Sequence, residues 1–171
     1  MIRGLDEELR TLKYSHVERE RRFLVDPARR PDLAGLPHIL IEDRYIDGSR
    51  MRLRRMIASD TSRVVLKLTK KYETADPAAR PMVTTYLTDV EYALLAALPA
   101  HSLVKRRYPL GAFSIDLFEG ALAGLELAES EQPNETALVG LVPPDWAIRE
   151  VSNDPRYDGG NLALLDALPA R

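Results

Sequence analysis

Cysteine is absent from this chain of 171 residues, which excludes disulfide bonds and thiolate-bound metal sites. No apolar run approaches the ~20 residues that a membrane-spanning helix needs, so we expect no membrane partner. The opening residues, MIRGLDEELR, contain no apolar stretch of the kind found in signal peptides. Together these absences lead us to expect a cytoplasmic protein.

Histidine is also scarce, and the three residues His16, His38 and His101 lie far apart in the sequence. A histidine metal site or a Ser–His mechanism therefore has no support, and the chain lacks the GxxxxGK(S/T) loop of P-loop enzymes. Its 24 basic and 26 acidic residues give a formal net charge of −2, so the overall field does not recruit nucleic acid, and we expect no nucleic-acid partner. Any function of charge must come from its local arrangement.

Hydrophobic residues make up 45% of the chain and charged residues 29%, as in a soluble globular domain. We treat residues 1–171 as one domain with residues 1–15 as an N-terminal extension, in which residues 5–13 could form a short helix. The capping box of Thr88 and Glu91 predicts a helix up to Leu98, and two more helices are expected around residues 135–141 and over 161–168, the last capped by Asn161. Strand-like runs cover residues 16–25, 39–46, 50–57, 63–71, 82–88, 102–110, 112–118, 125–131 and 147–152. This order of elements predicts an α+β fold rich in antiparallel strands.

Charged residues alternate with apolar ones along most of these strands, and charges of one sign cluster within a strand. Glu18, Glu20 and Arg22 share one face because side chains two apart in a strand point the same way. One interpretation is an ordinary half-solvated sheet. The clustering favours another, a sheet curled nearly closed with its charged face inward. Because a dry charged interior costs several kcal/mol per ion, such an interior would hold water, metal ions and a multiply charged ligand.

The bases on these faces suit a polyanion, and the carboxylates beside them suit hard divalent cations such as Mg²⁺ or Mn²⁺. Together they have the chemistry of polyphosphate handling. Lys70 and Lys71 could extend this basic lining to the mouth of the interior, but a solvated strand end is the preferred interpretation. The six bases assigned to the inward face are Arg22, Arg52, Arg54, Lys67, Lys105 and Arg107.

The run Glu18-x-Glu20-x-Arg22 followed by FLV resembles the ExExK motif of the CYTH superfamily, the triphosphate tunnel metalloenzymes. Further matching motifs follow in the family's order: RLR at 52–54, LKLTK at 66–70, KRRY at 105–108, IDLFEG at 115–120, AESE at 128–131 and REVSNDPRY at 149–157. The resemblance covers about residues 16–165. It implies a roughly eight-stranded, closed antiparallel β-barrel, a tunnel with helices packed outside, that binds a triphosphate and a divalent metal, Mg²⁺ or Mn²⁺.

The resemblance also assigns roles to individual residues. Lys67, with Tyr45 of the DRYI run, would be catalytic, by positioning water or stabilising the leaving charge. The substrate-binding bases would be Arg22, Arg52, Arg54, Lys67, Lys105 and Arg107. The metal ligands would be Glu18, Glu20, Asp116, Glu129, Glu131 and Glu150.

Three positions depart from the family pattern. Arg22 replaces a lysine with a bulkier planar group, Thr84 stands where many members carry a glutamate, and Ser114 stands where some do. We predict divalent-metal-dependent hydrolysis of a triphosphate, first of all inorganic tripolyphosphate. The alternatives are a non-catalytic binder of triphosphate or polyphosphate, an adenylate cyclase and a thiamine triphosphatase. The sequence leaves open whether the protein forms a homodimer.

Overall fold

Nine β-strands build most of the computed structural model, which describes residues 14–74 and 79–169. The predicted helix at residues 5–13 lies outside this range. The predicted strands are all present, with ends that shift by a few residues. The strands are β1 (His16–Val25), β2 (Ile39–Ile46), β3 (Met51–Ala58), β4 (Val64–Lys71), β5 (Ala79–Tyr86), β6 (Ala100–Leu110), β7 (Phe113–Phe118), β8 (Glu126–Glu131) and β9 (Ala147–Glu150).

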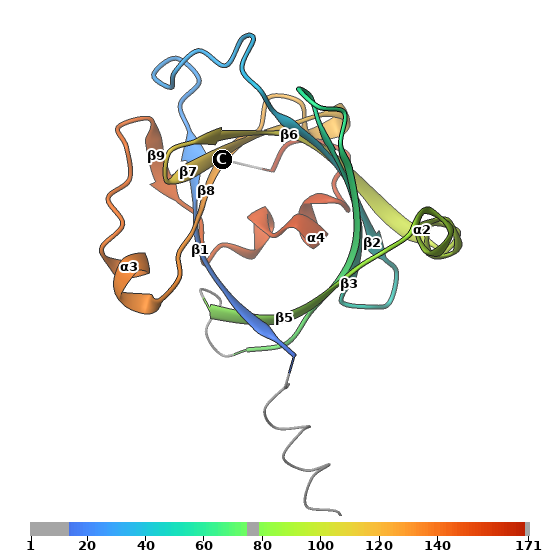
Figure 1. The fold of residues 1–171 in the computed structure, drawn as a ribbon. Helices are drawn as coiled ribbons and strands as arrows, with labels where there is room; N and C mark the ends of the chain where they lie inside the picture. The colour runs from blue at the N-terminus through green and yellow to red at the C-terminus, as the bar shows by residue number, and fades with distance from the viewer. Residues whose placement is uncertain (1–13, 75–78, 170–171) are drawn as a thin grey trace, which may run out of the picture.

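Eight of these strands close into an antiparallel barrel (Figure 1). The sheet order is β5-β4-β3-β2-β6-β7-β8-β1, and the pairing of β5 with β1 closes the ring. Along one edge of β1, His16 to Arg19 pair with β5, and further along Phe23 to Val25 pair with the extra strand β9. The predicted α+β fold with a closed barrel is confirmed.

The helices are short, and most of them lie outside the barrel. Helix α2 (Asp89–Ala96) begins at the predicted capping box, with Thr88 and Glu91 bonded reciprocally. Helix α3 (Glu135–Val139) is capped by Asn134, and two 3₁₀ turns, η1 (Gly120–Leu122) and η2 (Pro155–Tyr157), complete the connections. In the part of the chain that is described, no helix has the length and apolar character of a membrane span.

Helix α4 (Gly159–Leu162) differs from the prediction in position and in length. Seen along the barrel, α4 lies within the ring of strands, whereas α2 lies outside it (Figure 1). A helix over 161–168 was expected, but Leu164 and Leu168 remain 57% and 49% exposed. A short helix depends on tertiary packing, and here only Leu162, which is 1% exposed, has a buried position.

Two apolar clusters hold the barrel, one on each face of the sheet. Cross-strand partners share a face, so Leu24 and its partner Leu127 lie on the inward face that carries Arg22 and Glu129. They pack inside the barrel with Tyr157 and Leu162, so the C-terminal segment packs across one end of the interior. The outer cluster contains Phe23, Val25, Leu33, Tyr108, Phe113, Ile115 and Ala128.

Candidate active site

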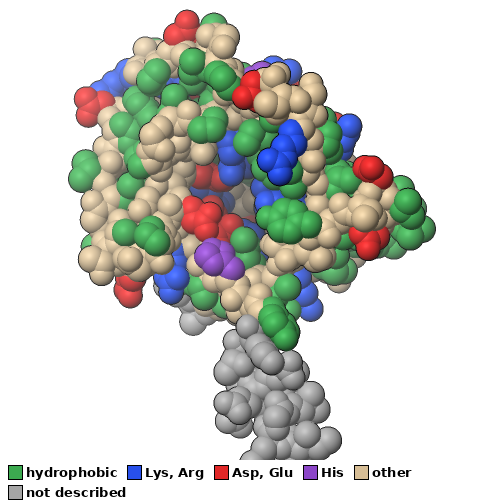
Figure 2. Space-filling view, in the orientation of Figure 1, with side chains coloured by type: hydrophobic (Ala, Val, Ile, Leu, Met, Phe, Trp, Pro, Cys, Tyr) green, Lys and Arg blue, Asp and Glu red, His purple; other side chains and the backbone are tan. Residues whose placement is uncertain are grey.

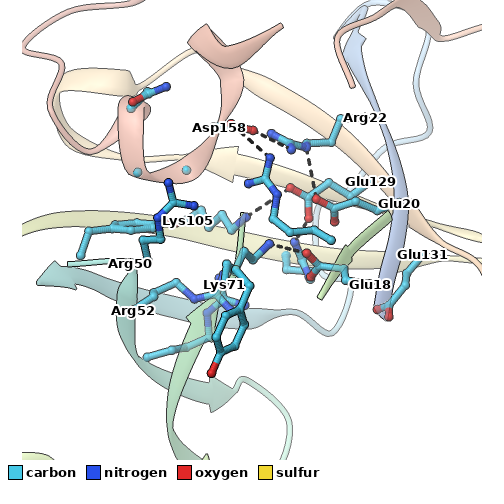
Figure 3. A pocket seen from close by; sticks show the side chains of 18 of the residues that line it. Glu18, Glu20, Arg22, Arg50, Arg52, Lys71, Lys105, Glu129, Glu131 and Asp158 are labelled. Atoms are coloured by element: carbon cyan, nitrogen blue, oxygen red, sulfur yellow. Dashed lines mark hydrogen bonds and ion pairs between the residues drawn. The ribbon is translucent and has the colours of Figure 1, made fainter. Parts of the chain in front are cut away.

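A cavity of about 390 Å³ occupies the barrel interior, and charged side chains from most strands line it (Figure 3). Figure 2 shows charged side chains gathered in the hollow at the centre of one face. The basic lining residues outnumber the acidic ones by eight to five, so the cavity attracts anions. The bases are Arg22, Arg50, Arg52, Arg54, Lys71, Arg80, Lys105 and Arg107, and the acids are Glu18, Glu20, Glu129, Glu131 and Asp158.

The predicted alternation places Glu18, Glu20 and Arg22 of β1 together in this lining. Glu18 accepts a hydrogen bond from Lys71, and Lys71 lowers the pKa of Glu18 against the opposing effect of burial. Glu20 lies 3.3 Å from Arg22 Nε. Burial, followed by the neighbouring charges of Glu129 and Glu18, nevertheless raises the pKa of Glu20. Glu20 is therefore the carboxylate with the least compensated charge in the group.

Glu129 faces this group from β8 and has basic partners on β6. Arg107 donates a hydrogen bond to Glu129, and Lys105 Nζ lies 3.7 Å from its Oε1. Although burial opposes ionisation, Lys105 and Arg107 hold the pKa of Glu129 well below its usual value. Glu129 is thus an ionised carboxylate within the basic wall of the cavity.

Two fully buried aspartates brace the bases of β3 and β6. Asp43 accepts hydrogen bonds of 2.6 Å from Arg54 Nε and from Arg54 Nη2. Asp116 accepts from Lys105 and from Arg107, the latter at 2.7 Å to each oxygen. Their exposed fractions are 1% and 0%. Each aspartate orients bases that must stay charged at a buried site.

The prediction of Asp116 as a metal ligand therefore needs correction. Its side chain shares the inward face as expected, but Lys105 and Arg107 cover both oxygens, and Asp116 is not among the cavity-lining residues. The equivalent brace, Asp43, was missed. Its position between Ile41 and Tyr45 on the inward face of β2 was the available signal.

The prediction of Glu150 as a metal ligand also needs correction. It lies opposite Phe23 in the pairing of β1 with β9, and Phe23 belongs to the outer cluster. Glu150 accordingly bonds Arg21 at 2.9 and 2.8 Å on the outside of the barrel, away from the cavity. Glu131 does reach the lining, but as an exposed residue 3.0 Å from His16 Nε2.

Tyr45 and Lys67 occupy neighbouring inward positions. Tyr45 lines the cavity beside Gly159, and burial together with Asp43 raises the pKa of Tyr45 to about 12, so the phenol is a neutral donor. Lys67 lies opposite Arg54 on β4, outside the lining set. Burial, Arg54 and Arg52 lower the pKa of Lys67 to about 8, and no hydrogen bond or ion pair of this side chain is found within residues 14–74 and 79–169.

Arg50, Arg80 and Asp158 line the cavity although the sequence did not single them out, and Lys71 lines it as well. Lys71 was interpreted as a solvated strand end, yet it lies two and four residues from Thr69 and Lys67 and thus shares their face. Lys70, by contrast, is exposed. At the departure from the family pattern, the Thr84 and Thr69 hydroxyls bond each other at 2.9 Å, so Thr84 supplies no charge.

Any metal ion bound in this cavity would have mainly carboxylate oxygens as its protein ligands. The described residues contain no group of three or more His, Asp or Glu arranged to hold an ion, because Glu18 and Glu129 turn towards Lys71 and Arg107. Glu18, Glu20 and Glu129 nonetheless line the same cavity, and burial together with the charges of Glu129 and Glu18 raises the pKa of Glu20. These carboxylates suit a hard divalent cation, which would relieve their repulsion.

No family model matches the chain. Two curated relatives are named inorganic triphosphatase: one from Acetivibrio thermocellus, 46% identical over 50 residues, and one from Nitrosomonas europaea, 42% identical over 52 residues. The matched segments are 29% and 30% of this chain. The chain spans about a third of the length of these relatives, 31% and 34%.

Solved structures extend the similarity to almost the whole barrel. The crystal structure of the inorganic triphosphatase NE1496 is similar with a TM-score of 0.54 and 26% identity, over 90% of this chain and 97% of that one. A second crystal structure of NE1496, described as a hypothetical protein, gives a TM-score of 0.54 and 27% identity, over 89% and 99% of the two chains.

Proposed function

We propose that the chain, whose barrel and similarities fit a CYTH-like triphosphate tunnel protein, is a divalent-metal-dependent triphosphatase that hydrolyses inorganic tripolyphosphate. The observation that supports this proposal best is the composition of the cavity. Eight bases surround a group of mostly half-buried carboxylates inside a closed barrel. A polyanion that brings its own metal ion matches both sets of charges.

The bases of β3 and β6 would hold the phosphates. Arg52 and Arg54 on one strand and Lys105 and Arg107 on another line the same cavity. Arginine presents a planar group that can bind two phosphate oxygens at once. Asp43 and Asp116 keep these side chains oriented before the ligand arrives, which lowers the cost of organising the site on binding.

The metal would be Mg²⁺ or Mn²⁺, held by Glu18, Glu20 and Glu129, with Glu131 at the rim. A bound divalent ion supplies charge neutralisation for the transferring phosphoryl group and orientation of the attacking water. When the phosphates engage Lys71 and Arg107, they would release Glu18 and Glu129 from these bases. The two carboxylates would then be free to complete the ligand set with Glu20.

Lys67 and Tyr45 would act at the leaving side. A lysine with a pKa of about 8 can hold or give up a proton near neutral pH. The phenol of Tyr45 stays protonated and can donate a hydrogen bond to a phosphate oxygen. The two would position water or stabilise the charge that develops on the departing phosphate.

A non-catalytic polyphosphate binder is the second candidate. It is favoured by the pairing of Thr84 with Thr69, which leaves a hydroxyl pair where a carboxylate was expected, and by the absence of a preformed three-ligand group among the described residues. In that case the bases would hold the same ligand and the carboxylates would be too few to activate water.

Phosphate release from a substrate panel separates the candidates. Tripolyphosphate, ATP, thiamine triphosphate and longer polyphosphate would each be tested with Mg²⁺, with Mn²⁺ and with EDTA. We expect release of phosphate from tripolyphosphate that requires the metal, whereas tight binding without release would identify the binder. Cyclic AMP formed from ATP would identify a cyclase, and preferred hydrolysis of thiamine triphosphate would identify that phosphatase.

Glu20→Gln tests the metal assignment, and Glu150→Gln is its matched control. We expect Glu20→Gln to lose at least ~100-fold in metal-dependent turnover while metal-free binding of tripolyphosphate does not weaken, because the variant removes a repelling carboxylate. Glu150 lies outside the barrel with Arg21, so Glu150→Gln keeps wild-type turnover. Full activity in Glu20→Gln would remove this carboxylate from the metal site.

A further inference from the structure

Asp158, at the start of α4, points its carboxylate into the basic wall of the cavity (Figure 3). Its Oδ1 lies 2.9 Å from Arg22 Nη2, and its Oδ2 lies 3.8 Å from Arg80 Nη2. The residue occupies the N-cap position of α4, yet its side chain makes no capping hydrogen bond. An aspartate at an N-cap ordinarily accepts from a backbone N–H of its own helix, as Asn134 does for α3. Asp158 instead neutralises two cavity bases.

Arg22 is held by the C-terminal segment at two consecutive residues. Its Nη1 donates to the carbonyl oxygen of Tyr157, and its Nη2 donates to Asp158. Arg22 is 8% exposed, and its Nε has no hydrogen-bond partner. Both Nη atoms of Arg22 are therefore already bonded, and a ligand phosphate that binds Nη2 must replace Asp158.

The docking of α4 also depends on a glycine. A Cβ atom at Gly159 would overlap the hydroxyl of Tyr45, and a Cβ at Gly160 would touch the same ring at 3.5 Å. The backbone next to Asp158 thus packs directly on Tyr45.

We propose that Asp158 is an internal competitor of the ligand, whose carboxylate occupies the place of one phosphate on Arg22 and Arg80. This inference rests on the proposed function, because it assumes that the ligand is a polyphosphate. Phosphate carries more charge than a carboxylate and also binds guanidinium groups with paired hydrogen bonds, so it can take over both bases. The displaced carboxylate then caps α4, so both arrangements satisfy Asp158 and the segment is a two-state element.

If Asp158 competes with a phosphate in this way, its effect on affinity depends on the length of the phosphate chain. A single phosphate can bind at Arg52, Arg54, Lys105 and Arg107 without disturbing Asp158. A chain of three phosphates that also engages Arg22 and Arg80 must displace the carboxylate, which reduces its affinity by the free energy of the lost ion pairs. Removing the charge of Asp158 therefore strengthens binding of the longer anion most.

Calorimetric titration in EDTA, where metal-dependent hydrolysis is stopped, tests the proposal. Tripolyphosphate and inorganic phosphate are titrated into the wild-type protein, into Asp158→Asn and into the control Asp154→Asn, whose carboxylate pairs with the exposed Arg156. We expect Asp158→Asn to bind tripolyphosphate about tenfold more tightly and inorganic phosphate less than about twofold more tightly. Equal gains for both anions would indicate a general charge effect and overturn the proposal, as would weaker binding of tripolyphosphate.

Gly159→Ala gives a second, independent readout with Asp158 intact. The added methyl group cannot fit against Tyr45, so we expect faster amide hydrogen exchange at residues 157–162 and tighter binding of tripolyphosphate, as in Asp158→Asn. Unchanged exchange and affinity would contradict the proposal. If the wild-type protein binds no tripolyphosphate in EDTA and releases no phosphate from it with Mg²⁺ or Mn²⁺, the proposed function fails as well. If it binds and hydrolyses tripolyphosphate but neither variant binds it more tightly, only the competition by Asp158 is refuted.

Discussion

Lys67 gives the sharpest test of the electrostatics inside the barrel. The side chain is half-buried opposite Arg54, and burial with Arg54 and Arg52 lowers its pKa from 10.5 to about 8. A change of that size corresponds to about 3 kcal/mol. Because the side chain is partly solvated, screening reduces this figure, and we expect an actual cost of about 1 to 2 kcal/mol for its positive charge at neutral pH. Lys67→Met should therefore stabilise the fold by that amount at pH 7.

The pH dependence of folding stability tests independently whether the charge of Lys67 destabilises the fold. Between pH 8 and 10.5 the unfolded chain holds the proton that the folded chain has lost, so the stability of the wild-type protein rises with pH in this range. Lys67→Met has no such group, and its advantage should shrink as the pH rises through this interval. Urea unfolding of both proteins at pH 7 and at pH 10 measures the difference.

Lys70→Met is the matched control, since Lys70 lies on the same strand with an exposed side chain. We expect it to change stability by less than about 0.5 kcal/mol. A Lys67→Met variant that is less stable than the wild-type protein at pH 7, or an advantage that stays constant with pH, would refute the reasoning. Loss of tripolyphosphate hydrolysis in the stabilised variant would show that the charge is retained for function at the expense of stability.

Three further predictions follow from the same geometry. Asp116→Asn removes the buried counter-charge that bonds both Lys105 and Arg107, so urea unfolding should show a loss of about 3 kcal/mol. The affinity for tripolyphosphate, measured calorimetrically in EDTA, should fall as the pH rises through about 8, where Lys67 loses its charge, and Lys67→Arg should abolish that step. Thr88→Ala removes the cap of α2 outside the barrel. It should cost about 1 kcal/mol in thermal unfolding and leave the rate of tripolyphosphate hydrolysis unchanged, and a changed rate would link α2 to the site.

Much of the cavity could be predicted because strand periodicity is a local property. Once residues 16–25 and 102–110 are strands, the side chains of Glu18 and Glu20, and those of Lys105 and Arg107, must share a face. Like-sign clustering suggested that this face is enclosed, and the barrel places all four residues in one cavity.

Other features depend on pairings that periodicity does not specify. Glu150 lies outside because β9 joins β1 in a register that puts Glu150 opposite Phe23. Asp116 is inward but covered, which depends on the lengths of the two neighbouring bases. Asp158 was not predicted at all, because it reaches the cavity through the path of the C-terminal segment and not through the repeat of a strand.

The position of α4 across one end of the barrel interior also restricts how a long polyphosphate chain could enter the cavity. Leu24, Leu127, Tyr157 and Leu162 pack together at that end, and the residues from Asp158 to Asn161 border the cavity. While this segment stays in place, a polymer cannot be threaded through the barrel and can only insert a terminus. Long polyphosphate would then be shortened stepwise from its ends, and an internal cut would require α4 to leave.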